Sequence, residues 1–117
     1  MIEFEYNFSR NKYEMLIDKS QISRVFQNLI INSIHSIQEA NVSVGKINVV
    51  SSISDNYLNI LILDNGIGLK YEKNELIKPY FTTKKRRGGS GLGLAIVEKI
   101  LFDHNAEFFI ENRTYYS

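Results

Sequence analysis

The sequence of 117 residues contains no cysteine, no tryptophan and a single proline. Without cysteine the chain has no disulfides and no thiolate metal sites, and this composition suits a reducing compartment, so we expect a cytoplasmic protein. The formal net charge is only +1, so the global charge favours neither nucleic acid nor an anionic membrane. The longest apolar runs, such as 60–63, are far shorter than the roughly 18 residues of a spanning helix. We therefore expect no nucleic-acid partner and no membrane contact by this chain.

The composition is that of a soluble globular domain. Hydrophobic residues make up 44% of the chain and charged residues 23%, which argues against disorder and against a coiled coil. The length fits one hydrophobic core and leaves no room for a second domain. We expect a single domain over residues 1–117.

Hydrophobic periodicity predicts the elements of an α+β fold. Residues 2–8 alternate as in a half-buried strand, and 13–17 form a candidate second strand. Ser20 is a suitable N-cap for a long helix that continues to Ala40. Strands at 46–54 and 57–63 are expected to pair as a hairpin through a turn at 54–56. A polar, basic loop over 70–87 precedes an apolar helix at 94–101 and a last short strand at 107–112.

The long helix carries two asparagines, Asn28 and Asn32, four residues apart and therefore on one helix face. Arg24 and His35 share this stripe. An amide oxygen suits a magnesium ion that is already bound to phosphates and water. In a chain rich in asparagine, however, two such residues at this spacing also arise by chance, and that alternative stays open.

Asp64 to Gly68, in the order Asp-Asn-Gly-Ile-Gly, follows directly after an apolar strand. A carboxylate at a strand end can accept a hydrogen bond from an exocyclic amine such as that of adenine, and glycines allow close approach to a flat base. Asp-Asn-Gly is also favoured turn chemistry, so locally a simple turn is the stronger interpretation.

A glycine-rich segment, 88–93, leads into the second helix. Backbone amides at a helix N-terminus form a site for phosphate oxygens. No lysine follows these glycines as a Walker A loop requires, and Ile96 stands where a dinucleotide fingerprint requires glycine or alanine. Both of those motifs are excluded, whereas a purely structural hinge stays open.

Taken together and in this order, these segments resemble the N, G1, F and G2 boxes of the histidine-kinase ATP-binding domain, in the GHKL superfamily with the Bergerat fold. The string Pro-Tyr-Phe-Thr-Thr-Lys at 79–84, followed by Gly-Ser-Gly-Leu-Gly-Leu-Ala-Ile-Val at 89–97, is its most specific part. It looks most like the nitrogen-regulation type of sensor kinase. The resemblance implies a two-layer α/β sandwich with a mixed sheet and helices on one face, and an ATP lid at about 70–90.

The resemblance also implies a role for each matching residue. Asn32 would bind magnesium, with Asn28 beside it on phosphate or metal; Asp64 would read the adenine amine, and Gly66 and Gly68 would make room for the base. Lys84 would face the phosphates, and Tyr80 and Phe81 would pack the lid. Gly91 and Gly93 would let the lid close and present amides to the triphosphate. The remaining expected contacts to ATP are His35, Thr82, Thr83, Ser90, Leu92 and Leu94.

One position separates the kinases from related gyrase, mismatch-repair and heat-shock ATPases. Those ATPases carry a water-activating glutamate four residues before the metal-binding asparagine, where this chain has Asn28. An amide is no useful base at neutral pH, so phosphoryl transfer to a protein group is favoured over hydrolysis. We expect a phosphoacceptor histidine in a separate domain, in the same longer protein or in trans, with a response regulator downstream.

The chain also departs from the family's pattern. Neither His35 nor His104 is followed by the acidic residue that follows the acceptor histidine, and His104 is expected to cap or follow its helix. His104-Asn105-Ala106 replaces the family's His-Gly-Gly, and the family's last strand is expected to be missing, which would expose a sheet edge. Two rival functions stay open: a serine kinase of the anti-sigma type, and a truncated ATP-binding fragment without catalytic activity.

Overall fold

The computed structural model describes residues 1–8, 15–68 and 93–111. The chain forms two compact units: unit 1 consists of Met1–Leu16 and Ile30–Ile67, and unit 2 of Ile17–Leu29 and Gly68–Ser117. The long helix α1, Lys19–Ala40, contributes its first half to unit 2 and its second half to unit 1. That residues 1–117 form a single domain stays a prediction.

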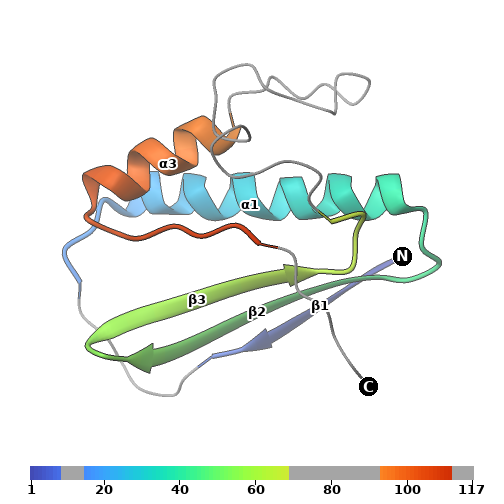
Figure 1. Cartoon of the computed structure of the whole chain (residues 1–117), viewed down its shortest axis with the longest axis horizontal. Helices are drawn as coiled ribbons and strands as arrows, with labels where there is room; N and C mark the ends of the chain where they lie inside the picture. The colour runs from blue at the N-terminus through green and yellow to red at the C-terminus, as the bar shows by residue number, and fades with distance from the viewer. Residues whose placement is uncertain (9–14, 69–92, 112–117) are drawn as a thin grey trace. The chain divides into compact units, whose positions relative to one another are not determined.

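Unit 1 contains a mixed three-stranded sheet (Figure 1). Its strands are β1 (Ile2–Asn7), β2 (Gly45–Ser54) and β3 (Tyr57–Asp64), in the order β1-β2-β3. β1 runs parallel to β2, and β3 runs antiparallel to it. The parallel pair needs a long crossover, and α1 lies within that connection. The predicted α+β class and mixed sheet are confirmed.

The hairpin between β2 and β3 has the predicted turn. Asp55 and Asn56 have positive φ angles of 51° and 64°, the combination of a two-residue type I′ turn. Asp and Asn adopt this left-handed conformation more readily than other side chains that carry a Cβ. The turn therefore sets the register in which Ser54 faces Tyr57 and Ile47 faces Asp64.

The core of unit 1 lies between the sheet and the second half of α1. Ile47 and Val49 alternate along β2 and are 1% and 7% exposed, while Ile37 of α1 is 4% exposed. Ile2, Ile30, Ile34 and Ile62 pack around them. Each fully buried side chain of this kind contributes about 1.5–3 kcal/mol, so Ile47→Ala would be the most damaging single truncation in this unit.

The core of unit 2 is a contact between the first half of α1 and the helix α3, Gly93–Asp103. Val25, Val97 and Ile100 are buried there, and Ile22, Leu29, Ile96, Leu101 and Phe108 pack around them. Ile96, Val97 and Ile100 recur at the three- and four-residue spacing of one helix face. The helix predicted at 94–101 is therefore confirmed.

The N-cap of α1 is Asp18, and the prediction of Ser20 was wrong. Asp18 Oδ1 accepts hydrogen bonds from the backbone N of Gln21 at 3.1 Å and from the hydroxyl of Ser20 at 2.8 Å. The Ser20 hydroxyl, followed by the Gln21 amide, holds the pKa of the Asp18 carboxyl below its ordinary value of 3.8. Asp and Ser are both good N-caps. Which of the two residues caps the helix depends on where α1 begins, and it begins at Lys19, directly after Asp18.

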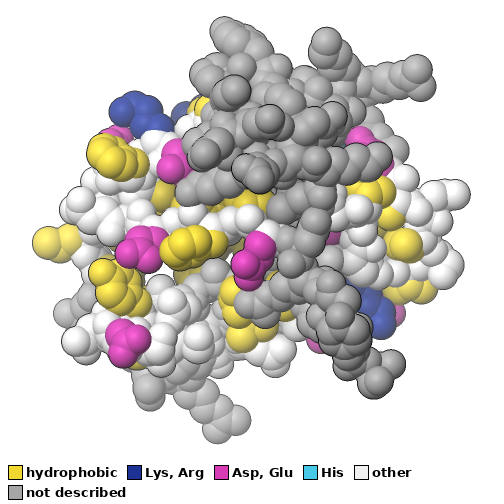
Figure 2. All heavy atoms as spheres, in the orientation of Figure 1, with side chains coloured by type: hydrophobic (Ala, Val, Ile, Leu, Met, Phe, Trp, Pro, Cys, Tyr) yellow, Lys and Arg dark blue, Asp and Glu magenta, His cyan; other side chains and the backbone are white. Residues whose placement is uncertain are grey.

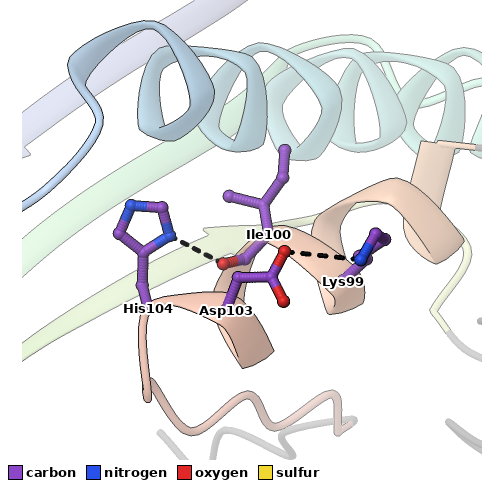
Figure 3. Close-up of polar contacts among 4 residues, drawn as sticks. All are labelled: Lys99, Ile100, Asp103 and His104. Carbon is purple, nitrogen blue, oxygen red and sulfur yellow. Dashed lines mark hydrogen bonds and ion pairs between the residues drawn. The ribbon is translucent and has the colours of Figure 1, made fainter.

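The end of α3 is closed by His104, as the sequence predicts. Asn105 has φ 56° and donates to Phe102 O, while Ala106 N donates to Leu101 O at 2.9 Å; this is a Schellman motif, with asparagine in the position that usually holds glycine. His104 Nε2 accepts a bond from Asp18 N at 3.0 Å. The neutral ring therefore carries its proton on Nδ1, which donates to Ile100 O at 2.8 Å (Figure 3).

Two predicted strands are wrong. Of the strand predicted at 13–17, the described residues 15–17 have no strand structure, and of the strand predicted at 107–112, neither do the described residues 107–111. Figure 1 draws the segment after α3 as an irregular trace. Phe108 packs against the two helices of unit 2. Its side chain is therefore partly buried although the segment around it pairs with no strand among the described residues. The lid predicted at 70–90 lies outside the described residues.

Hydrophobic side chains reach the surface at several places between acidic and neutral ones (Figure 2). Phe102 and Phe109 are the most exposed aromatic residues in the described part of unit 2. In unit 1 the rings of Phe4 and Tyr6 are stacked, and the ring of Phe8, just after β1, is tilted against that of Tyr6. Neither helix of the described residues combines the length and apolarity that crossing a bilayer requires.

Candidate functional site

In unit 1, the candidate site begins where β3 ends. Asp64 faces Ile47 of β2 as the last pair of the ladder, and its side chain is exposed. Asp64 Oδ1 accepts a bond from Gly66 N at 2.8 Å, which closes a turn of the Asx type. This bond holds the carboxylate in one orientation and leaves Oδ2 for a further donor.

Gly66 lies directly against α1. A Cβ at this position would fall 2.6 Å from the carbonyl carbon of Ser36, closer than real Cβ atoms approach, and Ile67 N donates to Ser36 O at 3.3 Å. Gly68 has a φ of 79°, which favours glycine. The loop is thus fixed to α1 one turn after Asn32. In unit 1, the turn that follows Asp64 therefore lies against α1 at Ser36, four residues after Asn32; that Asn32, Asp64 and Gly66 share one binding site stays a prediction.

In unit 2, Asn28 of α1 lies at the start of α3. The Asn28 Oδ1 atom is 3.8 Å from the position that a Cβ at Gly93 would take. The Nδ2 atom of Asn28 is buried and has no hydrogen-bond partner among the residues that the structure describes. The first turn of α3 also presents backbone N–H groups without helical acceptors. A buried amide donor beside a helix N-terminus is an arrangement that an anionic ligand would satisfy.

The other predicted site residues fall into two groups. Asn32, His35 and Leu94 are half-buried on α1 and on the first turn of α3, and Asn32 and His35 each interact with another group. Those in the second group lie outside the described residues: Thr82, Thr83, Lys84, Ser90, Gly91 and Leu92. Within residues 1–8, 15–68 and 93–111, no three His, Cys, Asp or Glu side chains cluster as metal ligands.

Sequence reasoning missed two residues of the unit 1 region. Gly66 packs against Ser36. Ser36 follows Asn32 by four residues on the same face of the helix, so the helical spacing could have identified it. For Asn65 the sequence indicates only a place in a turn. Its side chain in fact holds two backbone groups of the segment that leads into β2.

The sequence matches the family described as histidine kinase-, DNA gyrase B-, and HSP90-like ATPases over residues 17–115. The chain belongs to this family. It is 31% identical, over 96% of its length, to a protein of Rickettsia prowazekii (strain Madrid E) named as an NtrY-like sensor histidine kinase. It is 38% identical, over 74% of its length, to the nitrogen regulation protein NtrY of Azorhizobium caulinodans. The chain spans 18% and 12% of these two relatives.

Among solved structures, a nucleotide-free form of the catalytic domain of histidine kinase ThkA is similar, with a TM-score of 0.77 and 29% identity. That likeness covers 97% of this chain and 72% of the other. Within its family, the chain is therefore an ATP-binding catalytic domain of the sensor histidine kinase class, close to the NtrY type.

Proposed function

We propose that the chain binds magnesium-ATP and transfers the γ-phosphoryl group to a histidine of a separate phosphoacceptor domain. The observation that carries this proposal is the Asn28 amide, whose buried Nδ2 lacks a partner among the described residues while its Oδ1 faces the start of α3. A buried donor without a partner costs about 1–3 kcal/mol. A phosphate oxygen at this helix N-terminus would recover that cost.

The proposal assigns adenine to residues of unit 1. Asp64 Oδ2 accepts a bond from the 6-amino group, because Oδ1 is already engaged by Gly66 N. Gly66 leaves the backbone accessible to the flat base, and Gly68, the first residue of the following segment, is expected to do the same. This arrangement discriminates against guanine, whose 6-position carries a carbonyl acceptor that would face the carboxylate.

The proposal assigns the phosphates to Asn28 and to the N-terminus of α3, with magnesium on the Asn32 amide oxygen. Magnesium prefers oxygen ligands and keeps several waters, so one amide together with phosphate oxygens is a suitable ligand set. When bound, it neutralises charge on the phosphate oxygens. Lys84 and the rest of the predicted lid complete the phosphate site in this proposal.

The acceptor histidine comes from outside this chain. In transfer, an acceptor ring nitrogen forms the new N–P bond while the bond to the bridging oxygen of ADP breaks, and Asn28 supplies no base to activate water instead. His104 supports this assignment, because both of its ring nitrogens are engaged, by Asp18 N and by Ile100 O. A response regulator then receives the phosphoryl group in the proposed pathway.

A binding experiment tests the nucleotide half. We expect a fluorescent ATP analogue to bind the 117-residue chain in a magnesium-dependent manner, and Asp64→Ala to weaken binding roughly 10- to 100-fold, the effect of a hydrogen bond to a charged group. Asn32→Asp and Gly91→Ala should abolish phosphoryl transfer. Asn59→Ala is the matched control. Asn59 lies on β3, as Asp64 does, but near the start of the strand, where its side chain donates to the hydroxyl of Ser54. No binding by the unmodified chain at millimolar analogue would exclude the proposal.

A transfer experiment tests the other half. Incubation of the chain with labelled ATP and the phosphoacceptor domain of an NtrY-type kinase should give a labelled product that is lost in acid and stable in base, as phosphohistidine is. An acid-stable product would indicate a serine kinase of the anti-sigma type. Binding without any labelled product would indicate a nucleotide-binding fragment that lacks turnover.

A further inference from the structure

The Asn65 side chain bridges two backbone groups of another segment in unit 1. Its Oδ1 accepts a bond from Lys46 N at 2.7 Å, and its Nδ2 donates to Val44 O at 3.0 Å. Its own backbone N donates to Lys46 O at 3.2 Å. Three hydrogen bonds thus attach one residue of the Asp-Asn-Gly turn to the start of β2.

These bonds extend the β2–β3 ladder by one pair in an unusual way. Ile47 and Asp64 are the last regular pair. The next pair, Lys46 and Asn65, would normally exchange two backbone bonds. Here the bond from Lys46 N goes to the Asn65 side-chain oxygen rather than to its backbone carbonyl. The Asn65 side chain thereby accepts the hydrogen bond of Lys46 N at the start of β2, while the Asn65 backbone turns away toward Gly66.

Only an amide of this length fits both partners. One partner is a backbone N–H and the other a backbone C=O, so the amide cannot be reversed. Aspartate at this position would still accept the bond from Lys46 N, but its second oxygen would repel Val44 O instead of donating to it. Alanine would remove both bonds.

We propose that Asn65 is a positioning residue for adenine recognition, which fixes the Asp64 carboxylate by tying the turn to β2. This inference rests on the proposed function, in which Asp64 accepts the adenine 6-amino group. The turn has two other attachments, the bond between Asp64 Oδ1 and Gly66 N and the bond from Ile67 N to Ser36 O. The first lies within the turn and the second attaches the turn to α1, so the Asn65 side chain supplies the side-chain attachment of the turn to the segment that leads into β2.

The test compares ATP with purine riboside triphosphate, which lacks the 6-amino group. The ratio of the two dissociation constants reports the bond to Asp64, whereas general loss of structure weakens both ligands alike. We expect Asn65→Ala to reduce the preference for ATP about tenfold, the size of one hydrogen bond, with little change in the affinity for the analogue. Asn65→Asp, which keeps the bond from Lys46 N, should lose less of the preference, and Asn59→Ala should lose none.

Each outcome bears on one of the two proposals. If Asn65→Ala keeps the full preference for ATP, or weakens both ligands equally, Asn65 has no positioning role. If Asn65→Ala does not fold, the dissociation constants of Asn65→Asp for ATP and for the analogue decide instead, by the same criteria. If the unmodified chain binds neither ligand, or Asp64→Ala keeps the preference for ATP, the proposed function fails at this site and the role of Asn65 fails with it.

Discussion

The two units differ in how many polar groups of their candidate binding residues already have a hydrogen-bond partner within the protein. In unit 1, Asp64, Asn65 and Gly66 are all held by hydrogen bonds or close contacts. In unit 2, the Asn28 amide has a buried donor with no partner among the described residues. A preorganised region binds its ligand without an ordering cost, whereas a buried unpaired donor destabilises the protein until a ligand arrives. Under the proposed function, the residues assigned to adenine are therefore held in advance, and ligand binding would change stability at the residues assigned to the phosphates.

The comparison predicts that glycine substitutions will differ most between the units. Gly66→Ala should destabilise the chain by about 1–3 kcal/mol and abolish ATP binding, because its Cβ would overlap the carbonyl carbon of Ser36. Gly93→Ala should keep or slightly raise stability, since the nearest atom to its Cβ is 3.8 Å away and alanine favours a helix. Urea unfolding measures both. Equal losses for the two variants would contradict the contrast.

A smaller effect of opposite sign is expected at Asn28. Asn28→Leu should raise the stability of the nucleotide-free chain by about 1 kcal/mol, because it removes a buried donor that has no partner among the described residues. The same change should weaken ATP binding, so stability and affinity move in opposite directions. Thermal unfolding with and without magnesium-ATP measures both quantities. A variant that loses stability without nucleotide would show that the Asn28 amide is already satisfied.

The smallest expected effect concerns the N-cap of α1. The pKa of Asp18 is lowered in the folded chain, first by the Ser20 hydroxyl, so its charge stabilises folding above the unfolded-state pKa near 3.8 and stops doing so as pH falls through the folded-state value. Asp18→Asn keeps an acceptor for Gln21 N but removes the charge. Its melting temperature should fall slightly at pH 7 and match that of the unmodified chain at pH 2. A difference that persists at pH 2 would indicate a cause other than the charge.

Elements that depend on local pattern were predicted well. The helix ending at Ala40, the hairpin with its turn at Asp55 and Asn56, and the helix after the glycines all agree with the structure. Their determinants are helical spacing, strand alternation and left-handed turn residues, which act over a few positions. The strand predicted at 107–112 failed because a strand needs a partner, and alternation does not reveal whether one is present.

The candidate site was predicted in part. Its residue types and their order along the chain identified Asn28, Asp64, Gly66 and Gly93, and the structure brings Gly66 to α1 and Asn28 to Gly93. The roles of these residues stay predictions. Ser36 and Asn65 were missed because each acts on a segment far away in the sequence, and their own residue types are common on helix surfaces and in turns.

By itself, the sequence determined the two helices, the hairpin and the family, because these follow from periodicity and from motifs carried within short stretches of chain. Only the tertiary structure decided that Asn65 takes the place of a backbone carbonyl for Lys46, that Gly66 has no room for a side chain, and that Asn28 keeps a buried donor with no partner among the described residues. Such facts depend on distances between atoms of residues that are far apart along the chain, and packing sets these distances only once the chain has folded.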